Sequence, residues 1–297
     1  MRAAMAVTIA MLVSGCAGPS PSRSVSPAGQ AEMAVVALDP AGRYLTHKAP
    51  VSVQHPTRAA SKDLAPSGKL RAAINFGNPI LAYKDDASGE ARGASVDLAR
   101  ELGRKLNVPV ELVLYTAAGK VVDGLKANEW DVAFYAIDPV RAVDTEFTAP
   151  YVVIEGAYLV SKQSSIQTND DVDREGVRIV VGKGSAYDLF LTREIRRATL
   201  VRAPTSPAVT DVMVAQKLEV AAGVKQQLIA DAKRYPGLRL LDGRFMEINQ
   251  AMAMPKGRVE GARYLAAFVE EIKLSGFVAD ALKRHNIDGA RVAAAGR

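Results

Sequence analysis

An aspartate and an arginine, Asp138 and Arg141, lie just past a short apolar run from Asp131 to Ala136. A run of this length predicts a buried strand, and open α/β sheets bind small ligands beyond the carboxyl ends of their strands. The planar guanidinium of Arg141 offers a fork of donors that suits a carboxylate. The alternative is a surface ion pair of Arg141 with Asp138 or Asp144, because isolated surface pairs are common. The sequence therefore offers a candidate carboxylate-binding group at this strand end.

A glycine-containing turn, Gly182-Lys183-Gly184-Ser185, follows an expected strand from Val177 to Val181. Its glycines allow a tight turn, and Ser185 with the free amides of the following helix can take up an anion. Ser185 can equally be an ordinary helix cap, and one serine can do both. The turn is not a nucleotide-binding P-loop, because the Gly-Lys-Ser/Thr ending is absent.

Three further candidates follow expected strands. Phe76 and Asn78 lie in the polar break after the strand from Leu70 to Ile74, and Lys225 follows the strand from Glu219 to Gly223. Phe76 could stack on a ligand, although an aromatic side chain at a strand end is more often part of the core. Lys225 could meet a second anionic group of the ligand, and the alternative is a solvated first helical turn.

The elements that must position these residues alternate along the chain. An amphipathic helix from Ser95 to Asn107, for example, is followed by a strand from Val110 to Tyr115. Alternation at this spacing predicts a parallel sheet with helices on both faces and right-handed crossovers. A chain of 297 residues is long enough for two modest lobes, each with its own core. The predicted fold class is therefore α/β.

The composition, 48% hydrophobic and 24% charged, is ordinary for a globular protein. Lys and Arg number 38 against 32 Asp and Glu, a net charge of +6, but the basic residues are scattered without interleaved aromatic residues. No nucleic-acid partner is expected. The three histidines, His47, His55 and His285, lie at no metal-ligand spacing from one another or from cysteine, so no metal site and no cofactor are expected.

The single cysteine, Cys16, closes an apolar start that runs from Ala3 to Val13 after one basic residue, Arg2. This start resembles a secretory signal with a lipoprotein cleavage site, in which Cys16 would carry the lipid. The apolar core is too short for a membrane-spanning helix. The alternative is a chance apolar start on a cytosolic protein. With no second cysteine, no intramolecular disulfide can form.

The segment from Arg141 to Tyr151 resembles the signature of the bacterial solute-binding proteins of family 3, the receptors of polar amino-acid ABC importers. That signature is an arginine followed by Phe-Ser/Thr-x-Pro-Tyr, matched here by Arg141 and Phe147-Thr148-Ala149-Pro150-Tyr151. A second pattern matches Gly93-Ala94-Ser95-Val96-Asp97-Leu98-Ala99, except that Ala94 replaces an aromatic residue. The resemblance covers roughly Leu64 to Ile287.

The resemblance implies a type 2 periplasmic-binding-protein fold, in which two α/β lobes are joined by a two-crossing hinge. It implies that Arg141 and Ser185 hold a ligand carboxylate in the cleft. With the N-terminal pattern, the expected division is a signal peptide at 1–16, a disordered tether at 17–63, lobe 1 at 64–158 and 254–288, lobe 2 at 159–253, and a frayed tail at 289–297.

One family position is not matched. The lobe 2 strand of the family typically reads Asp-Ala-x-x-x-Asp, with the last acid gripping the ligand ammonium, whereas Glu219 to Val224 ends in valine. A buried ammonium without an acidic partner would be costly. Either Asp138 supplies the charge or the ligand has no α-ammonium. Asp138 could instead pair with Arg141 when the cleft is empty, or cap the turn before Pro139.

The function implied by the resemblance is a non-catalytic, monomeric receptor in the periplasm, and the N-terminal pattern adds a lipid anchor at Cys16. It would bind a small carboxylate-bearing solute, an amino acid or a related organic acid, and present it to an ABC permease of the inner membrane. The alternative is an enzyme on the same fold, such as a cyclohexadienyl (prephenate/arogenate) dehydratase. Asp138, or less readily Glu155, would then be the general acid, although no paired acid and base stand out.

Overall fold

The computed structural model describes residues 32–38, 44–50 and 55–295. The chain divides into two compact units, residues 1–50 and residues 51–297. Cys16 and the expected signal peptide at 1–16 lie outside the described residues. In the part of the chain that is described, no helix combines the length and the apolar character needed to cross a membrane.

The region expected as a disordered tether, residues 17–63, contains regular structure in its described parts. In the first unit, β1 (Glu32–Leu38) and β2 (Tyr44–Pro50) pair antiparallel along their whole length. In the second unit, α1 (Arg58–Leu64) begins at Thr57, whose hydroxyl oxygen accepts an amide hydrogen bond at 3.0 Å. The expected tether therefore ends before α1. A single cap residue such as Thr57 is a short sequence signal, and the Pro- and Ser-rich composition around it obscured that signal.

α1 is hydrogen-bonded to the beginning of α7 (Val259–Leu274), which lies far along the chain. Leu64 is fully buried. The carboxylate of Asp63 accepts a hydrogen bond from the Gly261 amide at 3.0 Å, and its carbonyl oxygen accepts one from Arg258 at 2.9 Å. The second unit therefore includes the helix that precedes the first predicted strand.

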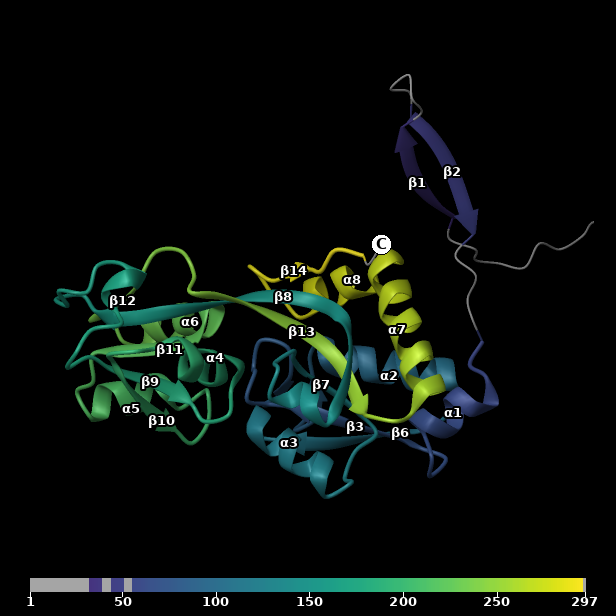
Figure 1. Ribbon diagram of the computed structural model, residues 1–297, viewed down its shortest axis with the longest axis horizontal. Helices are drawn as coiled ribbons and strands as arrows, with labels where there is room; N and C mark the ends of the chain where they lie inside the picture. Colours follow the sequence, from purple (N-terminus) through teal and green to yellow (C-terminus); the bar gives the residue numbers. More distant parts are fainter. Residues whose placement is uncertain (1–31, 39–43, 51–54, 296–297) are drawn as a thin grey trace, which may run out of the picture. The chain divides into compact units, whose positions relative to one another are not determined.

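Among the described residues of the second unit, ten strands share one sheet. They are β3 (Leu70–Asn75), β6 (Val110–Tyr115), β7 (Val132–Ala136), β8 (Thr145–Ser161), β9 (Arg178–Gly182), β10 (Thr199–Ala203), β11 (Val220–Val224), β12 (Leu238–Leu240), β13 (Met246–Pro255) and β14 (Arg291–Val292). Their order is β10-β9-β11-β8-β13-β7-β3-β6, and β12 and β14 also pair with β8 (Figure 1). β4 (Tyr83–Lys84) and β5 (Ala91–Arg92) form a separate hairpin.

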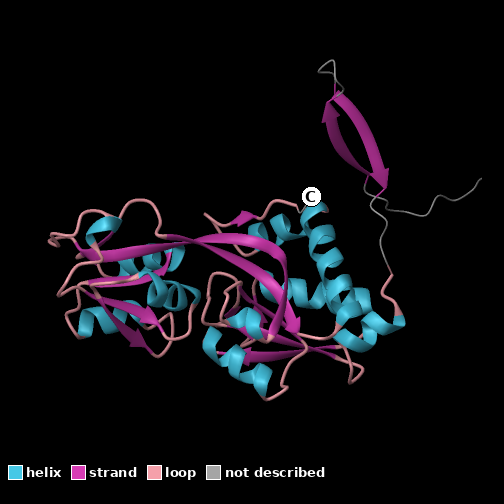
Figure 2. Cartoon of the chain, in the orientation of Figure 1, coloured by secondary structure: helices cyan, strands magenta, loops and turns pink. Residues whose placement is uncertain are grey.

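Helices flank the strands in two groups, which we call lobe 1, with β3, β6 and β7, and lobe 2, with β9, β10 and β11 (Figure 2). Besides α1 and α7, the helices are α2 (Ala94–Leu106), α3 (Ala118–Lys126), α4 (Ala186–Glu194), α5 (Val209–Ala215), α6 (Lys225–Arg234) and α8 (Phe277–Arg284). α4, α5 and α6 belong to lobe 2, and the others to lobe 1 (Figure 1).

The long strands β8 and β13 connect the lobes (Figure 1). They pair with each other from Thr145 opposite Pro255 to Gly156 opposite Met246. The predicted parallel sheet is present within each lobe, where β3 runs parallel to β6 and β7, and β9 to β10 and β11. At the crossings the pairing is antiparallel, because β8 and β13 carry the chain between the lobes in opposite directions.

The predicted helix from Ser95 to Asn107 is present as α2. It starts at Gly93, which has φ 123°, and a Cβ added there would lie 2.3 Å from a backbone oxygen, so only glycine fits. It ends at Asn107 in the left-handed region, φ 54°, which suits asparagine. Its apolar side, including Val96 and Leu102, is fully buried against the sheet.

The tail expected at 289–297 is ordered in its described part. Arg291 and Val292 of β14 pair with Val153 and Val152 of β8, and Ala293 is buried. The expectation of a frayed end is wrong there, because the exposed edge of a crossing strand offers free backbone groups that a short segment can pair with.

Candidate functional site

Arg141 is positioned by the sharp turn that follows β7. The five residues of β7 are all buried, and the chain then turns through Asp138, whose carboxylate accepts a hydrogen bond from the Val140 amide at 2.9 Å. A short 3-10 turn, Arg141–Val143, begins directly after it. The side chain of Arg141 is brought back beneath the strand end and is only 3% exposed.

The contacts of the Arg141 guanidinium are all to neutral groups. It donates from Nη1 to the Ala136 carbonyl at 2.7 Å and from Nη2 to the Gly184 carbonyl at 2.8 Å, and it lies over the Tyr135 ring. Its Nε is buried and has no hydrogen-bond partner among the described residues. Burial lowers the pKa of Arg141, with Tyr135 and Asp138 opposing the change. The site therefore holds a buried positive charge without a direct anionic partner.

Ser185 is the residue before α4, and its hydroxyl oxygen accepts a hydrogen bond from the Asp188 amide at 3.0 Å. It is thus a helix cap, the alternative that the sequence left open. The Gly184 amide is held by the Asp188 carboxylate at 2.8 Å. The first-turn amides of Ala186 and Tyr187 have no partner within the helix and belong to residues that face the cavity between the lobes.

That cavity has a volume of about 30 Å³, room for about two water molecules. Of the predicted site residues, Arg141, Ser185 and Asn78 line it. Asn78 is buried, and its Oδ1 has no hydrogen-bond partner among the described residues. The structure brings these three together, and their role toward a ligand stays a prediction.

The other three predicted residues do not line this cavity. Asp138 is 3% exposed and pairs at 2.9 Å with Arg193 of lobe 2, not with Arg141. Phe76 is half-buried and packs against the core, which is the alternative interpretation of an aromatic side chain at a strand end. Lys225 points to a different pocket.

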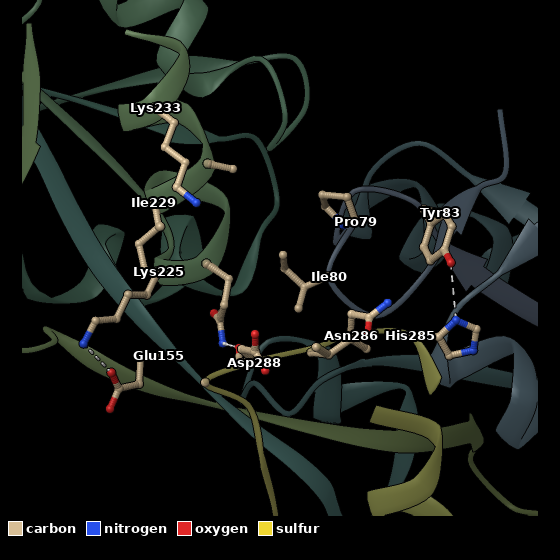
Figure 3. A pocket seen from close by; sticks show the side chains of 14 residues that line it. Pro79, Ile80, Tyr83, Glu155, Lys225, Ile229, Lys233, His285, Asn286 and Asp288 are labelled. Carbon is tan, nitrogen blue, oxygen red and sulfur yellow. Dashed lines mark hydrogen bonds and ion pairs between the residues drawn. The ribbon is translucent and has the colours of Figure 1, made fainter. Parts of the chain in front are cut away.

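The pocket that Lys225 lines has a volume of about 520 Å³ and lies between α6 of lobe 2 and, in lobe 1, Pro79, Ile80, Tyr83 and the segment after α8 (Figure 3). Lys225 donates to Glu155 of β8 at 2.9 Å, and Arg244 contacts the same carboxylate at 3.2 Å. The hydrogen bond from Lys225 is the main cause that lowers the pKa of Glu155. Lys225 is therefore neutralised by an acid of the hinge strand.

Four polar residues that the sequence did not single out also line the cavity: Asn75, Tyr187, Ser206 and Gln250. Burial raises the pKa of Tyr187 to about 12, although Ser206 and Ser185 oppose the change, so its hydroxyl stays neutral. Gln250 is buried within the crossing strand β13, opposite Ala136. The available sequence signal for this residue was a glutamine directly before the apolar half of the strand, Ala251 to Met254.

The lobes are in contact around the cavity. Besides the Arg141 and Asp138 contacts across the gap, two glycines meet: a Cβ added to Gly184 would lie 2.9 Å from the Gly119 Cα. These contacts hold the lobes together beside the cavity, which explains its small volume.

Comparison with known proteins identifies the family to which this chain belongs. Residues 70–286 match the bacterial extracellular solute-binding proteins, family 3. A probable amino-acid ABC transporter periplasmic-binding protein of Sinorhizobium fredii is 28% identical over 158 residues, 50% of this chain and 53% of that protein. The cyclohexadienyl dehydratase of Pseudomonas aeruginosa is 24% identical over 159 residues, 52% and 58% of the two chains. The chain spans about half the length of the curated relatives it matches.

Among solved structures, the solute receptor for L-cysteine of Neisseria gonorrhoeae superposes with a TM-score of 0.67 at 22% identity, covering 78% of this chain and 95% of that one. This likeness, with the two crossing strands, identifies the fold as the type 2 periplasmic-binding-protein fold.

Proposed function

Because the chain belongs to the bacterial extracellular solute-binding proteins of family 3, we propose that it is an extracytoplasmic receptor of an ABC importer and that Arg141 holds the carboxylate of a small solute in the inter-lobe cavity. The observation that supports this role is the buried guanidinium without an ion pair. Within the described residues, two of the three guanidinium nitrogens of Arg141 donate to carbonyl groups, and the third, Nε, has no acceptor. A ligand carboxylate would supply the missing charge, since a buried charge without a partner is costly.

The geometry of the guanidinium supports two-point binding. Nε and Nη2 lie on one edge of the planar group, and two parallel hydrogen bonds from such an edge match a carboxylate. In the structure Nε is free and Nη2 donates to the Gly184 carbonyl of lobe 2. A carboxylate would take both donors and displace that carbonyl, so the Gly184 carbonyl occupies the place of one ligand oxygen.

Binding would couple to a hinge motion about β8 and β13. A cavity of about 30 Å³ is too small for a solute, so entry requires the lobes to part. A ligand that contacts both lobes then favours the closed state by its own binding free energy. We further propose that Cys16 carries a lipid that holds this receptor at the membrane, and that an ABC permease accepts the solute.

Replacing Arg141 with alanine tests the proposal. A thermal-shift screen over short amino, hydroxy and keto acids first finds the stabilising solute. The variant should bind it more weakly by about 2–4 kcal/mol, about 30- to 700-fold, because a charge-assisted hydrogen-bonded contact is lost. Calorimetry on both proteins measures the difference.

Arg263→Ala is the matched control, because that side chain is 73% exposed and does not line the cavity. It should leave the affinity unchanged. Arg141→Lys keeps the charge without the planar fork and should give an intermediate loss. Equal affinity in Arg141→Ala and the wild type, with both folded, would exclude the proposed role.

The similarity to a cyclohexadienyl dehydratase supports a second candidate function, that of an enzyme. A general acid must reach the substrate in its protonated form. Asp138 is paired with Arg193, and Glu155 is paired with Lys225 and Arg244, with its pKa lowered. The surroundings of Glu155 therefore favour its carboxylate form, and the Asp138 carboxylate is engaged by an arginine. Incubation with prephenate and arogenate tests this alternative: product formation would support an enzyme, and saturable binding without turnover supports a receptor.

A further inference from the structure

The side chains around the inter-lobe cavity carry one charge, that of Arg141. The other polar side chains that line it are neutral: Asn75, Asn78, Ser185, Tyr187, Ser206 and Gln250. Val224, at the end of β11, contributes an apolar wall. The cavity therefore contains a group for an anion and, among the described residues that line it, no carboxylate for a cation.

The acids next to the lining residues are already neutralised. Asp138 pairs with Arg193 at 2.9 Å and also holds the Val140 amide. Asp188 pairs with Arg202 at 3.0 Å and holds the Gly184 amide. Turning either carboxylate toward a ligand would break an ion pair and leave a backbone amide without its acceptor, which carries its own cost. A ligand ammonium in this cavity would lack a counter-ion.

Two unsatisfied groups indicate what the cavity accepts. The Nε of Arg141 is a buried donor without an acceptor, and Oδ1 of Asn78 is a buried acceptor without a donor. Both residues line the cavity and are more than nine-tenths buried. A carboxylate satisfies the first group, and a neutral hydroxyl satisfies the second without bringing a second charge into a water-poor space.

We propose, resting on the function above, that the solute is a small hydroxy carboxylic acid that carries a hydroxyl group where an amino acid has its ammonium. The hydroxyl donates to Asn78 while the carboxylate accepts from Arg141. Neutral donors and acceptors of Tyr187, Ser206 and Gln250 surround the pair. Discrimination against an amino acid follows from the cost of burying an unpaired ammonium.

Matched pairs of ligands that differ in this one group test the proposal. Glycolate and glycine, L-lactate and L-alanine, and L-malate and L-aspartate are compared by calorimetry on the full chain, with pyruvate as the keto analogue of lactate. The hydroxy member of at least one pair should bind at least about tenfold more tightly than its amino partner. If the amino acid binds as tightly as its hydroxy partner in the pair with the highest affinity, the proposal is overturned.

The failure of this proposal is distinguishable from failure of the proposed receptor. Amino acids that bind more tightly than hydroxy acids, with binding lost in Arg141→Ala, would leave the receptor role standing and refute the hydroxy acid. If no acid in the panel binds the folded protein, both proposals fail. Pyruvate binding as tightly as lactate would remove the role of Asn78 as acceptor and also refutes the proposal.

A gain-of-function variant is the second test. Val224 lies in the cavity wall and precedes α6 with extended backbone, φ −64° and ψ 128°, a position where aspartate is a favoured helix cap. Val224→Asp should therefore fold, and it should shift the preference by at least about tenfold toward the amino member of each pair. Val224→Asn, similar in size and uncharged, should not. Unchanged preference in Val224→Asp would show that a missing acid is not what excludes the ammonium, and the proposal would fail.

Discussion

At the scale of single residues, the site depends on groups that lie between two lobes. Arg141 comes from the end of a lobe 1 strand, and the carbonyl that it contacts comes from Gly184 of lobe 2. Gly184 has φ +72°, where a side chain is strained, and lies against Gly119 of α3. Two glycines therefore allow the backbones of the two lobes to approach each other beside the cavity.

Gly184→Ala should weaken solute binding by more than about tenfold. The added Cβ would lie 2.9 Å from the Gly119 Cα, so the lobes cannot close to the observed distance, and the positive φ adds about 1 kcal/mol of strain. Affinity by calorimetry and Tm by scanning are the measurements. An affinity equal to that of the wild type would contradict this role of Gly184.

Two control variants distinguish an effect on the closure of the lobes from an effect of backbone strain at a positive φ. Gly119→Ala adds a Cβ with ordinary contacts, 3.6 Å from the Gly184 Cα, and should bind the solute nearly normally. Gly257→Ala has a similar backbone, φ +87°, with nothing within 4 Å of the added atom. It should lower the Tm without changing the affinity.

At the scale of elements, the contact between β8 and α6 joins the hinge to lobe 2. Glu155 of the crossing strand is bound by Lys225, the first residue of α6, and by Arg244, which lies before β13. This small network gives Lys225 a partner within the protein. Its predicted ligand role was based only on its position after a strand. The neighbouring pocket of about 520 Å³ is lined by this pair (Figure 3).

Glu155→Gln should destabilise the protein by about 0.5–1 kcal/mol at pH 7, the size of a partly exposed ion-pair network. The folded pKa of Glu155 is lowered from its ordinary 4.5, so its contribution is fully present above that pH and is lost as pH falls through the folded pKa. The stabilities of wild type and variant should therefore converge in acid.

Denaturant unfolding at pH 7, 5 and 3 measures this convergence. Glu146→Gln is the control, because Glu146 lies exposed on the same strand and forms no ion pair among the described residues. If the difference in unfolding free energy between Glu155→Gln and the wild type stays constant with pH, the charge of Glu155 does not cause that difference.

At the scale of the whole molecule, the second unit consists of two lobes that share a sheet through β8 and β13 (Figure 1). The ion pair of Asp138 with Arg193 and the contact of Arg141 with Gly184 cross between them. These contacts are few and polar, so they can be exchanged for contacts with a solute at modest cost. Such an arrangement suits a receptor that must open to release its cargo.

The proposed tether to the membrane belongs to this scale too. In a bacterial host, the full chain should incorporate a radiolabelled fatty acid and sediment with membranes, whereas Cys16→Ser should do neither. Both proteins should retain the same solute affinity, because Cys16 precedes the family match at residues 70–286. Labelling that persists in Cys16→Ser would disprove this attachment site.

The sequence by itself determined the alternation of strands and helices, the predicted helix at 95–107 and the position of Arg141 after a buried strand. These follow from local periodicity, caps and turn residues, which act over a few positions. α1 and β14 were missed, because their stability comes from partners far along the chain, α7 and β8.

Only the tertiary structure decided which acids are available to a ligand. Asp138 and Arg193 are 55 positions apart, and no local pattern shows that they pair across the lobes or that Lys225 meets Glu155. Ion pairs between distant segments depend on how elements pack, so the charge balance of the cavity emerges only when both lobes are in place. That packing leaves Arg141 as the one charged side chain among the described residues that line the cavity.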